Sequence, residues 1–327
     1  MKNVSIIVPV YNASETIHTC LDAILNLDYP QELLEIIVVN DGSTDNTVEL
    51  IQQMKSPRIK IINNDRNRGR AFTRLKGAKE SSYDHLLFID SRVIIDRGAL
   101  KAIEKSGKSI QSPLTIKGTD TIWESALNSL RRLAFKKFYQ SRETTFIDLS
   151  NFDDTPKGTT ALYIHKELFI RATMAIEYEN RYVSEDTKLL LFIVEGGKRI
   201  YLNPDFEITY LQRSGLKVNV VHLYERGPRF VDYYYGRHKT YTTLINLTLF
   251  SPLFLVGFIY LNIITFPLLL LVLLCLHTCF ATLVGEDIRK KCILFFLFPI
   301  IASSFGCGVV KGLGIKVWRK IKTLEIK

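Results

Sequence analysis

The sequence predicts an α/β protein, a mostly parallel β-sheet flanked by helices, followed by an α-helical membrane region. Two observations support this prediction. Up to residue 89, short and almost continuously apolar runs alternate with stretches of helical periodicity, which is typical of a sheet covered by helices on both faces. From residue 244 onward, long uncharged runs replace that alternation, and runs of this length are typical of membrane helices.

The predicted sheet begins with four strands. Each is a short run rich in valine, isoleucine or leucine, and a helical stretch separates it from the next, so we expect the strands to lie parallel. The predicted strands cover residues 4–10, 34–39, 59–62 and 85–89, and the predicted helices cover residues 13–27, a stretch through Val48 and Ile51, and residues 70–80.

Residues 121–139 are expected to form one amphipathic helix with several basic residues. Such a helix can lie on a membrane or contact an anionic acceptor, and it can also be an ordinary solvated surface helix. Its predicted apolar face consists of Ile122, Ala126, Leu130, Leu133 and Ala134.

The last part of the chain is predicted to enter the membrane. Residues 244–284 contain no charged side chain and would form about 60 Å of helix, roughly twice the hydrocarbon thickness of a bilayer. After a short charged break, a second apolar run covers residues 292–310. We therefore expect about three transmembrane helices within residues 243–311, with a candidate turn at Asn262, and a basic tail at 312–327.

Residues 219–242 are predicted to be an amphipathic segment at the membrane interface. Three consecutive tyrosines at 233–235 lie between Arg229 and Lys239, a pattern that places aromatic rings at headgroup depth beside basic side chains. Residues 1–218 are then expected to form the domain that precedes the membrane region.

The charge distribution agrees with a membrane partner. The formal net charge is +10, and the last 87 residues hold 9 Lys/Arg against 3 Asp/Glu. A basic excess among apolar runs indicates a membrane surface and makes nucleic acid the weaker candidate. No signal-peptide pattern follows Met1, so we expect the first domain in the cytosol, while the positive-inside tendency leaves the side of the tail open. The five cysteines form no CxxC pair and support neither a zinc site nor a disulfide framework.

Polar side chains follow three of the predicted strands. Tyr11 follows the first, Asp41 the second, and Asp90 and Arg92 the fourth. Ligands of parallel α/β sheets bind beyond the carboxyl ends of the strands, so these residues predict a nucleotide pocket. Neither GxGxxG nor GxxxxGK[ST] occurs, which argues against a dinucleotide oxidoreductase or a P-loop NTPase.

Six segments then carry a resemblance to a known family. They read VSIIVPVYNAS at 4–14, IIVVNDGSTDNT at 36–47, NRGRAFTRLKGA at 67–78, FIDSR at 88–92, VSEDTKL at 183–189 and GKRIYLNPD at 197–205. In sequence and in order, they resemble the motifs of family 2 glycosyltransferases of the membrane-anchored type with C-terminal transmembrane helices. The resemblance covers roughly residues 3–210 and implies the GT-A fold of nucleotide-diphospho-sugar transferases.

The resemblance implies a set of donor-binding residues. Pro9 and Tyr11 would line the base pocket, and Asp41 would bind the nucleoside, with a UDP-sugar favoured. Arg68 and Arg74 would contact the donor phosphates. From the residues alone, two simpler interpretations stay open: Asp41 can be a turn and N-cap residue, and the arginines can belong to a solvated face.

The resemblance also implies catalytic and metal-binding residues. Asp90 would face the donor diphosphate through a divalent cation, Mg²⁺ or Mn²⁺. Arg92 replaces the second aspartate of the family's Asp-x-Asp motif and can pair with phosphate oxygens instead. Asp186 would be the general base, positioned by Glu185, although this pair can also cap the helix that follows. His222 is either a ligand near the phosphates or a core histidine.

These residues together predict an inverting glycosyltransferase. It would transfer a sugar from a nucleotide-sugar donor to a hydroxyl of a lipid-linked saccharide or surface glycan, at the cytosolic face of a bacterial or archaeal cell membrane. Two alternatives stay open at this point. One is a polyprenyl-phosphate sugar transferase, and the other is a catalytically inactive donor-binding or scaffolding module, which only Arg92 suggests.

Overall fold

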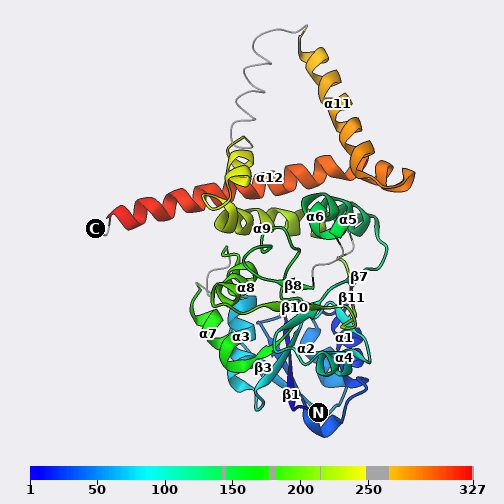
Figure 1. The fold of residues 1–327 in the computed structure, drawn as a ribbon, viewed down its shortest axis with the longest axis vertical. Helices are drawn as coiled ribbons and strands as arrows, with labels where there is room; N and C mark the ends of the chain where they lie inside the picture. The colour runs from blue at the N-terminus through cyan, green and yellow to red at the C-terminus, as the bar shows by residue number, and fades with distance from the viewer. Residues whose placement is uncertain (142–144, 177–181, 214, 248–264, 326–327) are drawn as a thin grey trace. The chain divides into compact units, whose positions relative to one another are not determined.

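The computed structural model describes residues 1–141, 145–176, 182–213, 215–247 and 265–325 (Figure 1). The chain forms two compact units. Unit 1 comprises residues 1–119, 135–181 and 185–212, and unit 2 comprises residues 120–134, 182–184 and 213–327. The predicted first domain, 1–218, included three short segments, 120–134, 182–184 and 213–218, that belong to unit 2.

Unit 1 is built on an eight-stranded sheet with the order β3-β2-β1-β4-β9-β6-β10-β8. The four predicted strands are confirmed and lie parallel to one another. Beyond β4 the sheet is mixed: β6 and β10 pair in parallel, and the β4–β9, β6–β9 and β8–β10 pairs are antiparallel. The strands are β1 (Val4–Val10), β2 (Leu34–Asn40), β3 (Ile59–Asn63), β4 (His85–Ile89), β6 (Gln111–Pro113), β8 (Phe146–Ile147), β9 (Ala161–His165) and β10 (Ile200–Asn203).

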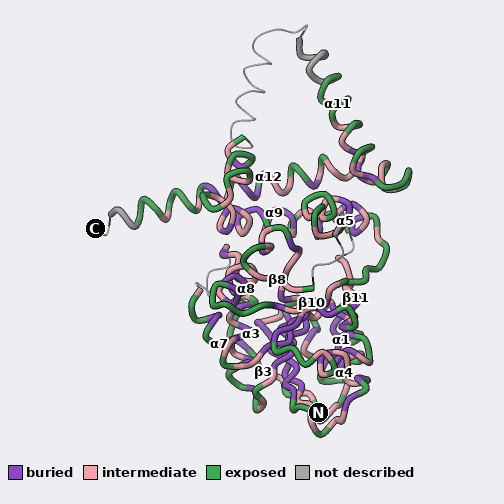
Figure 2. The backbone as a smooth tube through the Cα atoms, in the orientation of Figure 1, coloured by how far each residue is buried: buried purple, intermediate pink, exposed green. Residues whose placement is uncertain are grey.

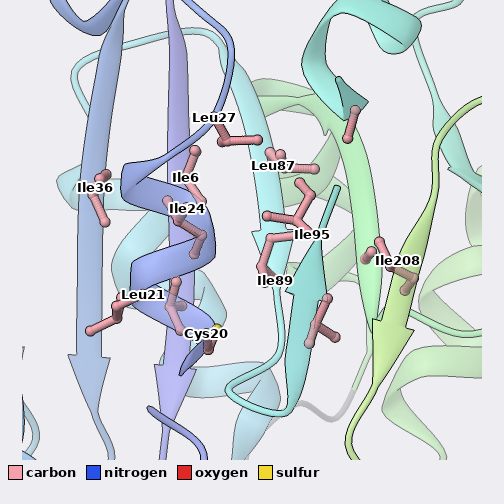
Figure 3. Close-up of a cluster of buried hydrophobic side chains, with 14 of the residues drawn as sticks. Ile6, Cys20, Leu21, Ile24, Leu27, Ile36, Leu87, Ile89, Ile95 and Ile208 are labelled. Carbon is pink, nitrogen blue, oxygen red and sulfur yellow. The ribbon is translucent and has the colours of Figure 1, made fainter. Parts of the chain in front are cut away.

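Alternate residues of β1 face opposite layers of helices, as the period of two in a strand requires. Ile6 belongs to a buried cluster with Leu21 and Ile24 of α1 (Figure 3). Ile7 faces the other layer, where Gly77 of α3 approaches it closely. Figure 2 shows the resulting buried centre of unit 1. The helices of unit 1 are α1 (Ile17–Leu25), α2 (Thr47–Gln53), α3 (Arg70–Glu80), α4 (Ala99–Ser106), α6 (Lys136–Ser141), α7 (Lys166–Met174) and α8 (Glu185–Glu195), with a 3₁₀ turn at Gln31–Leu33.

The helix α3 has the predicted bounds, whereas α1 is shorter than the predicted 13–27. The reason is local. The backbone N–H of Ala13 donates to Thr47 Oγ1 at 2.8 Å, and that of Ser14 donates to an Asp45 carboxylate oxygen at 3.2 Å. These bonds fix residues 13 and 14 to the segment after β2, and the helix begins only at Ile17.

A second, three-stranded sheet completes unit 1. Its central strand pairs antiparallel with one neighbour and parallel with the other. The strands lie in the order β5 (Val93–Ile95), β11 (Ile208–Tyr210) and β7 (Ile116–Lys117).

The single helix predicted at 121–139 is wrong. The chain forms α5 (Ile122–Ala134) in unit 2 and α6 in unit 1, with a turn at Phe135 between them. The predicted apolar face of α5 is wrong in part, because Ile122 and Leu133 are exposed while Trp123 and Ala126 are buried. Trp123 and Ala126 pack in an apolar cluster of unit 2 with Leu294 and Ile301, so tertiary packing selects a face that is rotated from the one the periodicity favours.

Unit 2 contains α5, α9 (Leu216–Tyr234), α11 (Thr265–Val284) and α12 (Ile288–Glu325). Among the described residues, one helix is long and apolar enough to cross a membrane, Ile288–Lys322. The predicted apolar run 292–310 lies in it, and the predicted basic tail is not a separate element, because the helix continues to Glu325. Part of the predicted membrane region, including Asn262, lies outside the described residues.

The close approach of α3 to β1 depends on Gly77. A methyl group at this position would lie 2.6 Å from Ile7 Cγ2 and 3.0 Å from Val39 Cγ2. We expect Gly77→Ala to destabilise the protein by about 1–3 kcal/mol, because overpacking outweighs the roughly 1 kcal/mol that alanine contributes to helix stability. Thermal unfolding of the full chain in detergent measures the effect. Gly158→Ala is the control, since its nearest neighbour is Thr160 Oγ1 at 3.9 Å. An unchanged or higher Tm for Gly77→Ala would contradict this packing.

Candidate active site

Charged side chains from three separate segments of unit 1 meet at one place. Arg70 and Arg74 lie one helical turn apart in α3, Asp90 follows the end of β4, and Glu185 and Asp186 form the first turn of α8. The backbone N–H of Asp90 donates to the Thr160 carbonyl oxygen at 3.0 Å, which fixes the position of Asp90 beside the start of β9.

Arg74 connects the two aspartates. Its Nη2 donates to Asp90 Oδ1 at 2.7 Å, and its Nη1 donates to Asp186 Oδ1 at 2.8 Å. Only 3% of its side chain is exposed, so both ion pairs are largely shielded from water. The interpretation of the arginines as a solvated face is therefore wrong for Arg74.

Arg70 forms the outer side of the same cluster. Its Nη2 lies 2.6 Å from Glu185 Oε1 and 3.5 Å from Asp186 Oδ2, and its side chain is 44% exposed. Glu185 is buried, so its carboxylate depends on Arg70 for compensation of its charge. Two arginines thus face three carboxylates.

The environment keeps Asp186 ionised. Burial alone would raise the pKa of Asp186, but the positive charges of Arg70 and Arg74 and the hydrogen bonds from Thr159 Oγ1 and Arg74 outweigh this effect. The pKa of Asp186 therefore lies well below the ordinary value of an aspartate. Among the described residues, Oδ2 of Asp186 contacts Arg70, at 3.5 Å, whereas Oδ1 accepts from both Arg74 and Thr159.

One hydrogen-bond donor in the cluster has no acceptor. The Nε of Arg74 is buried and unpaired within the described part of the chain. A buried polar group without a partner is unfavourable and often marks a place where a ligand binds. An anionic ligand that reaches this side of the guanidinium would satisfy it.

Asp41 holds the segment that leads into α3. Its Oδ1 accepts from the backbone N–H of Arg68 and from Asn64 Nδ2, both at 2.8 Å, and its Oδ2 accepts from the N–H of Gly69 at 2.9 Å. Gly69 has a φ of 91°, in the left-handed region that favours glycine. The carboxylate of Asp41 thus fixes the backbone just before Arg70, a role that neither the turn nor the N-cap interpretation described. Its role as a nucleoside ligand stays a prediction.

The other predicted donor-binding residues occupy different surroundings. Pro9 is buried within β1, Tyr11 is exposed after it, and the guanidinium of Arg68 lies 4.1 Å from the centre of the Phe72 ring. The carbonyl oxygen of Arg92 accepts from the Leu211 N–H at 2.7 Å beside β5. Their contacts with a donor stay predictions.

A divalent cation would have few protein ligands here. Among the described residues, no group of three or more His, Cys, Asp or Glu side chains is arranged to hold a metal ion. The predicted ligand His222 lies in α9 of unit 2, and its role as a ligand stays a prediction. Mg²⁺ is commonly held by one or two carboxylates and by substrate phosphates, and Asp90 fits that limited role.

Arg70 and Thr159 belong to the cluster but were absent from the predicted site. The sequence does contain a signal for Arg70, because it precedes Arg74 by four residues and the two share a face of α3. It contains no signal for Thr159, whose contact with Asp186 depends on how β9 enters the sheet.

A model of glycosyl transferase family 2 matches residues 5–159. These residues belong to glycosyl transferase family 2. Relatives of the domain include the poly-beta-1,6-N-acetyl-D-glucosamine synthases of Staphylococcus epidermidis, 37% identical, and of Staphylococcus aureus strain COL, 38% identical. Each match covers 100 residues, which are 30% of this chain and 24% of the relative. The chain thus matches about a quarter of the length of these curated relatives.

Two solved structures resemble the chain in fold. The S. aureus TarS 1–349 complex with UDP-GlcNAc is 18% identical, with a TM-score of 0.52 and coverage of 94% of this chain and 89% of that one. The mannosyltransferase PcManGT from Pyrobaculum calidifontis, in complex with GDP-Man and Mn²⁺, is 17% identical, with a TM-score of 0.57 and coverage of 95% and 87%. The predicted GT-A fold is confirmed.

The ionisation of Asp186 in unit 1 can be tested through stability. A carboxylate with a lowered pKa contributes stability above its unfolded pKa of about 3.9, and loses it as pH falls through the folded pKa. We expect Asp186→Asn to lower the free energy of unfolding by about 1–3 kcal/mol at pH 7. The difference from the wild type should stay constant from pH 7 to pH 5 and shrink only below about pH 4.

Thermal and denaturant unfolding across this pH range check the expectation. Asp154→Asn is the control, because the Lys137–Asp154 pair is exposed and such pairs contribute about 0–1 kcal/mol. A wild-type-to-variant difference that already shrinks between pH 7 and pH 5 would show that Asp186 titrates near neutrality.

Proposed function

We propose that the chain is an inverting, membrane-attached glycosyltransferase. It would transfer a sugar from a nucleotide-sugar donor, with a UDP-sugar favoured, to a hydroxyl of a lipid-linked saccharide or surface glycan at the cytosolic face of the membrane. The observation that carries the proposal is the convergence of Asp90 and Asp186 on the buried guanidinium of Arg74. Through this guanidinium, the predicted phosphate-facing residue and the predicted base belong to one network of ion pairs.

In the proposed reaction, Asp186 accepts the proton of the acceptor hydroxyl through Oδ2. The hydroxyl oxygen then forms a bond to the anomeric carbon while the bond from that carbon to the donor diphosphate breaks. The nucleoside diphosphate leaves with the bonding electrons. Because the attack comes from the face opposite the leaving group, the anomeric configuration inverts.

The arginines would link donor binding to the strength of the base. With Arg70 and Arg74 directed at its carboxylate, Asp186 is ionised but weakly basic. A donor diphosphate near these guanidinium groups would share their positive charge and accept from Nε of Arg74. The pKa of Asp186 would then rise, because its compensating charge is divided between two anions. Asp186 would become an effective base only when the donor is present.

The proposed divalent cation would be held by Asp90 together with phosphate oxygens of the donor. When bound, it would neutralise part of the negative charge that develops on the diphosphate. A Mn²⁺ ion is present in the complex of PcManGT, and the donors of the two similar structures, UDP-GlcNAc and GDP-Man, agree with a nucleotide sugar.

A membrane location and a glycan acceptor are supported by different features. The long apolar helix of unit 2 and the uncharged run in the sequence support attachment to a membrane. The relatives named as poly-beta-1,6-N-acetyl-D-glucosamine synthases support a saccharide acceptor. An inactive scaffolding module is disfavoured, since the cluster retains an ionised base and cationic groups for a diphosphate.

Nucleotide release from a panel of nucleotide sugars tests the activity. We expect the full chain in detergent to release free nucleotide from at least one donor, faster with a saccharide acceptor. Asp186→Asn should lower kcat by about 10²–10⁴-fold without weakening donor binding, because the base is lost while both arginines remain available to the diphosphate. Wild-type turnover in this variant would reject Asp186 as the base, and no release from any donor would favour the scaffolding alternative.

Donor binding tests the role of Asp41. We expect Asp41→Ala to weaken nucleotide binding by about 10–100-fold, since a charge-assisted hydrogen bond contributes about 1.5–3 kcal/mol. Isothermal titration with the active nucleotide measures the Kd. Asn64→Ala is the control for the loop, because it removes one bond to Asp41 and leaves the carboxylate in place. Equal weakening in both variants would mean that Asp41 acts through the backbone of residues 68 and 69 alone.

A further inference from the structure

Within unit 2, α12 packs along α9 through small residues. A methyl group on Gly227 of α9 would clash with the backbone of Gly308, and one on Gly312 would lie 2.7 Å from Pro228 Cα. Gly308 and Gly312 are four residues apart and therefore lie on one face of α12, where they allow the two backbones to touch. Val309 and Leu313 are buried beside them.

The first half of α12 packs on α5 through larger apolar side chains. Leu294 and Ile301 pack with Trp123 and Ala126 of α5. At its start, Arg289 Nη1 lies 3.5 Å from an Asp120 carboxylate oxygen, just before α5. Thus α12 is in contact with α5 and α9 over most of its length (Figure 1).

These two partner helices are unsuited to the interior of a bilayer. A charged side chain in the hydrocarbon region is costly, and each partner helix carries several. The charged residues are Glu124, Arg131 and Arg132 in α5 and Lys217, Glu225, Arg226, Arg229 and Asp232 in α9. Because α12 packs on both, an upright α12 would pull these charges into the hydrocarbon. Its 38 residues would also measure about 57 Å, against a hydrocarbon thickness of about 30 Å.

The C-terminal half of α12 has an exposed apolar stripe. Val310, Val317 and Ile321 lie on one helical face, with Trp318 beside them, and Val317 and Trp318 are 58% and 61% exposed. This stripe lies on the side of the helix opposite the buried Gly312, with the buried Leu313 between the two faces, and Figure 2 shows this end of α12 largely exposed. Five basic residues and no acidic one occur between residues 310 and 324: Lys311, Lys316, Arg319, Lys320 and Lys322.

The basic side chains of α12 that lie next to α9 have neighbours that are typical of a membrane–water interface. Lys311 Nζ lies 4.9 Å from the ring centres of both Tyr182 and Tyr224, and Lys316 Nζ donates to the Tyr235 carbonyl oxygen at 2.7 Å. Tyrosine and lysine together are typical of the headgroup region and not of the hydrocarbon centre.

We infer that α12 lies in the plane of the membrane and that its C-terminal half binds the surface of an anionic phospholipid bilayer. The stripe of Val310, Val317, Trp318 and Ile321 enters the boundary between headgroups and acyl chains, and Arg319, Lys320 and Lys322 contact the anionic headgroups. The inference rests on the membrane attachment proposed above. It differs from the single-span interpretation that length and composition alone favour for this helix.

Depth measurement by fluorescence quenching tests the inference. Single cysteines replace Val310, Val317, Ile321 and Lys320 in a full-length variant without its natural cysteines, and each receives an environment-sensitive fluorophore. The protein is reconstituted in phosphatidylcholine vesicles with and without phosphatidylglycerol, with nitroxides near the headgroups or near the bilayer centre. Glu80→Cys in unit 1 is the control for a position outside the membrane. All four α12 positions are exposed, so the substitutions leave the packing on α9 intact.

In a helix that lies in the plane, positions 310, 317 and 321 have the same depth. We expect shallow nitroxides to quench all three more than deep ones, with less quenching at position 320. A spanning helix would separate positions 310 and 321 by about 16 Å in depth, and such a gradient would overturn the inference while leaving membrane attachment intact. Absence of quenching at all positions, with cross-linking between chains through 317 or 321, would overturn it in favour of a second copy on the stripe.

Charge substitutions test the lipid class. We expect the triple substitution Arg319→Gln, Lys320→Gln and Lys322→Gln to reduce quenching at position 317 at least twofold in vesicles with phosphatidylglycerol, and to have little effect without it. The matched control replaces Lys79, Lys105 and Lys198, three exposed lysines of unit 1, by glutamine. Equal effects of the two triple variants would reject specific binding of anionic lipid by α12. Nucleotide release is measured separately, so a failure of the proposed enzyme activity is distinguishable from a failure of this inference.

Discussion

The burial of the Arg74 guanidinium determines how unit 1 is assembled. An arginine remains charged in the interior of a protein, and removing it from water is costly unless carboxylates of good geometry surround it. Asp90 and Asp186 supply those carboxylates from segments that lie far apart in the chain. The end of β4, the middle of α3 and the start of α8 must therefore meet, and any arrangement that separates them leaves a buried charge without compensation.

The mixed sheet is what makes this meeting possible. The parallel strands β2, β1 and β4 bring Asp41 and Asp90 to one edge of the sheet, as parallel strands do. The neighbouring strand β9 runs the other way and begins at that same edge, so Thr159 and Thr160 arrive beside Asp90. From there, Thr159 Oγ1 donates to Asp186, and its carbonyl oxygen accepts from Arg74 at 3.3 Å. The antiparallel strand therefore connects Asp90 to Asp186 and Arg74.

The sequence predicted elements and candidate site residues well where neighbouring residues in the chain form a motif or a regular pattern. Asp41, Asp90 and Asp186 each follow or begin a regular element within a recognisable motif, and the strands β1 to β4 and the helix α3 were predicted nearly residue by residue. Contacts between distant segments were not predictable in this way. No local pattern indicates that Thr159 donates to Asp186, and the spacing that pairs Arg70 with Arg74 is equally compatible with a solvated helix face. The break at Phe135 and the buried side of α5 were also missed, because they depend on contacts with distant segments. Trp123, for example, packs against residues of unit 2 that lie far along the chain.

The hydropathy of a helix takes no account of the helices that pack on it. For α12, those neighbours change the expected position in the membrane. Its composition is compatible with a membrane span, and its partners are helices that carry several charged residues. The free energy of placing a helix in a bilayer includes everything that packs on it, so the charges of α5 and α9 must be counted with the apolar side chains of α12. The glycines at 227, 308 and 312 make that packing close, and an intimate contact between backbones resists separation on insertion. An apolar helix held in this way is more stable at the surface of the membrane than across it.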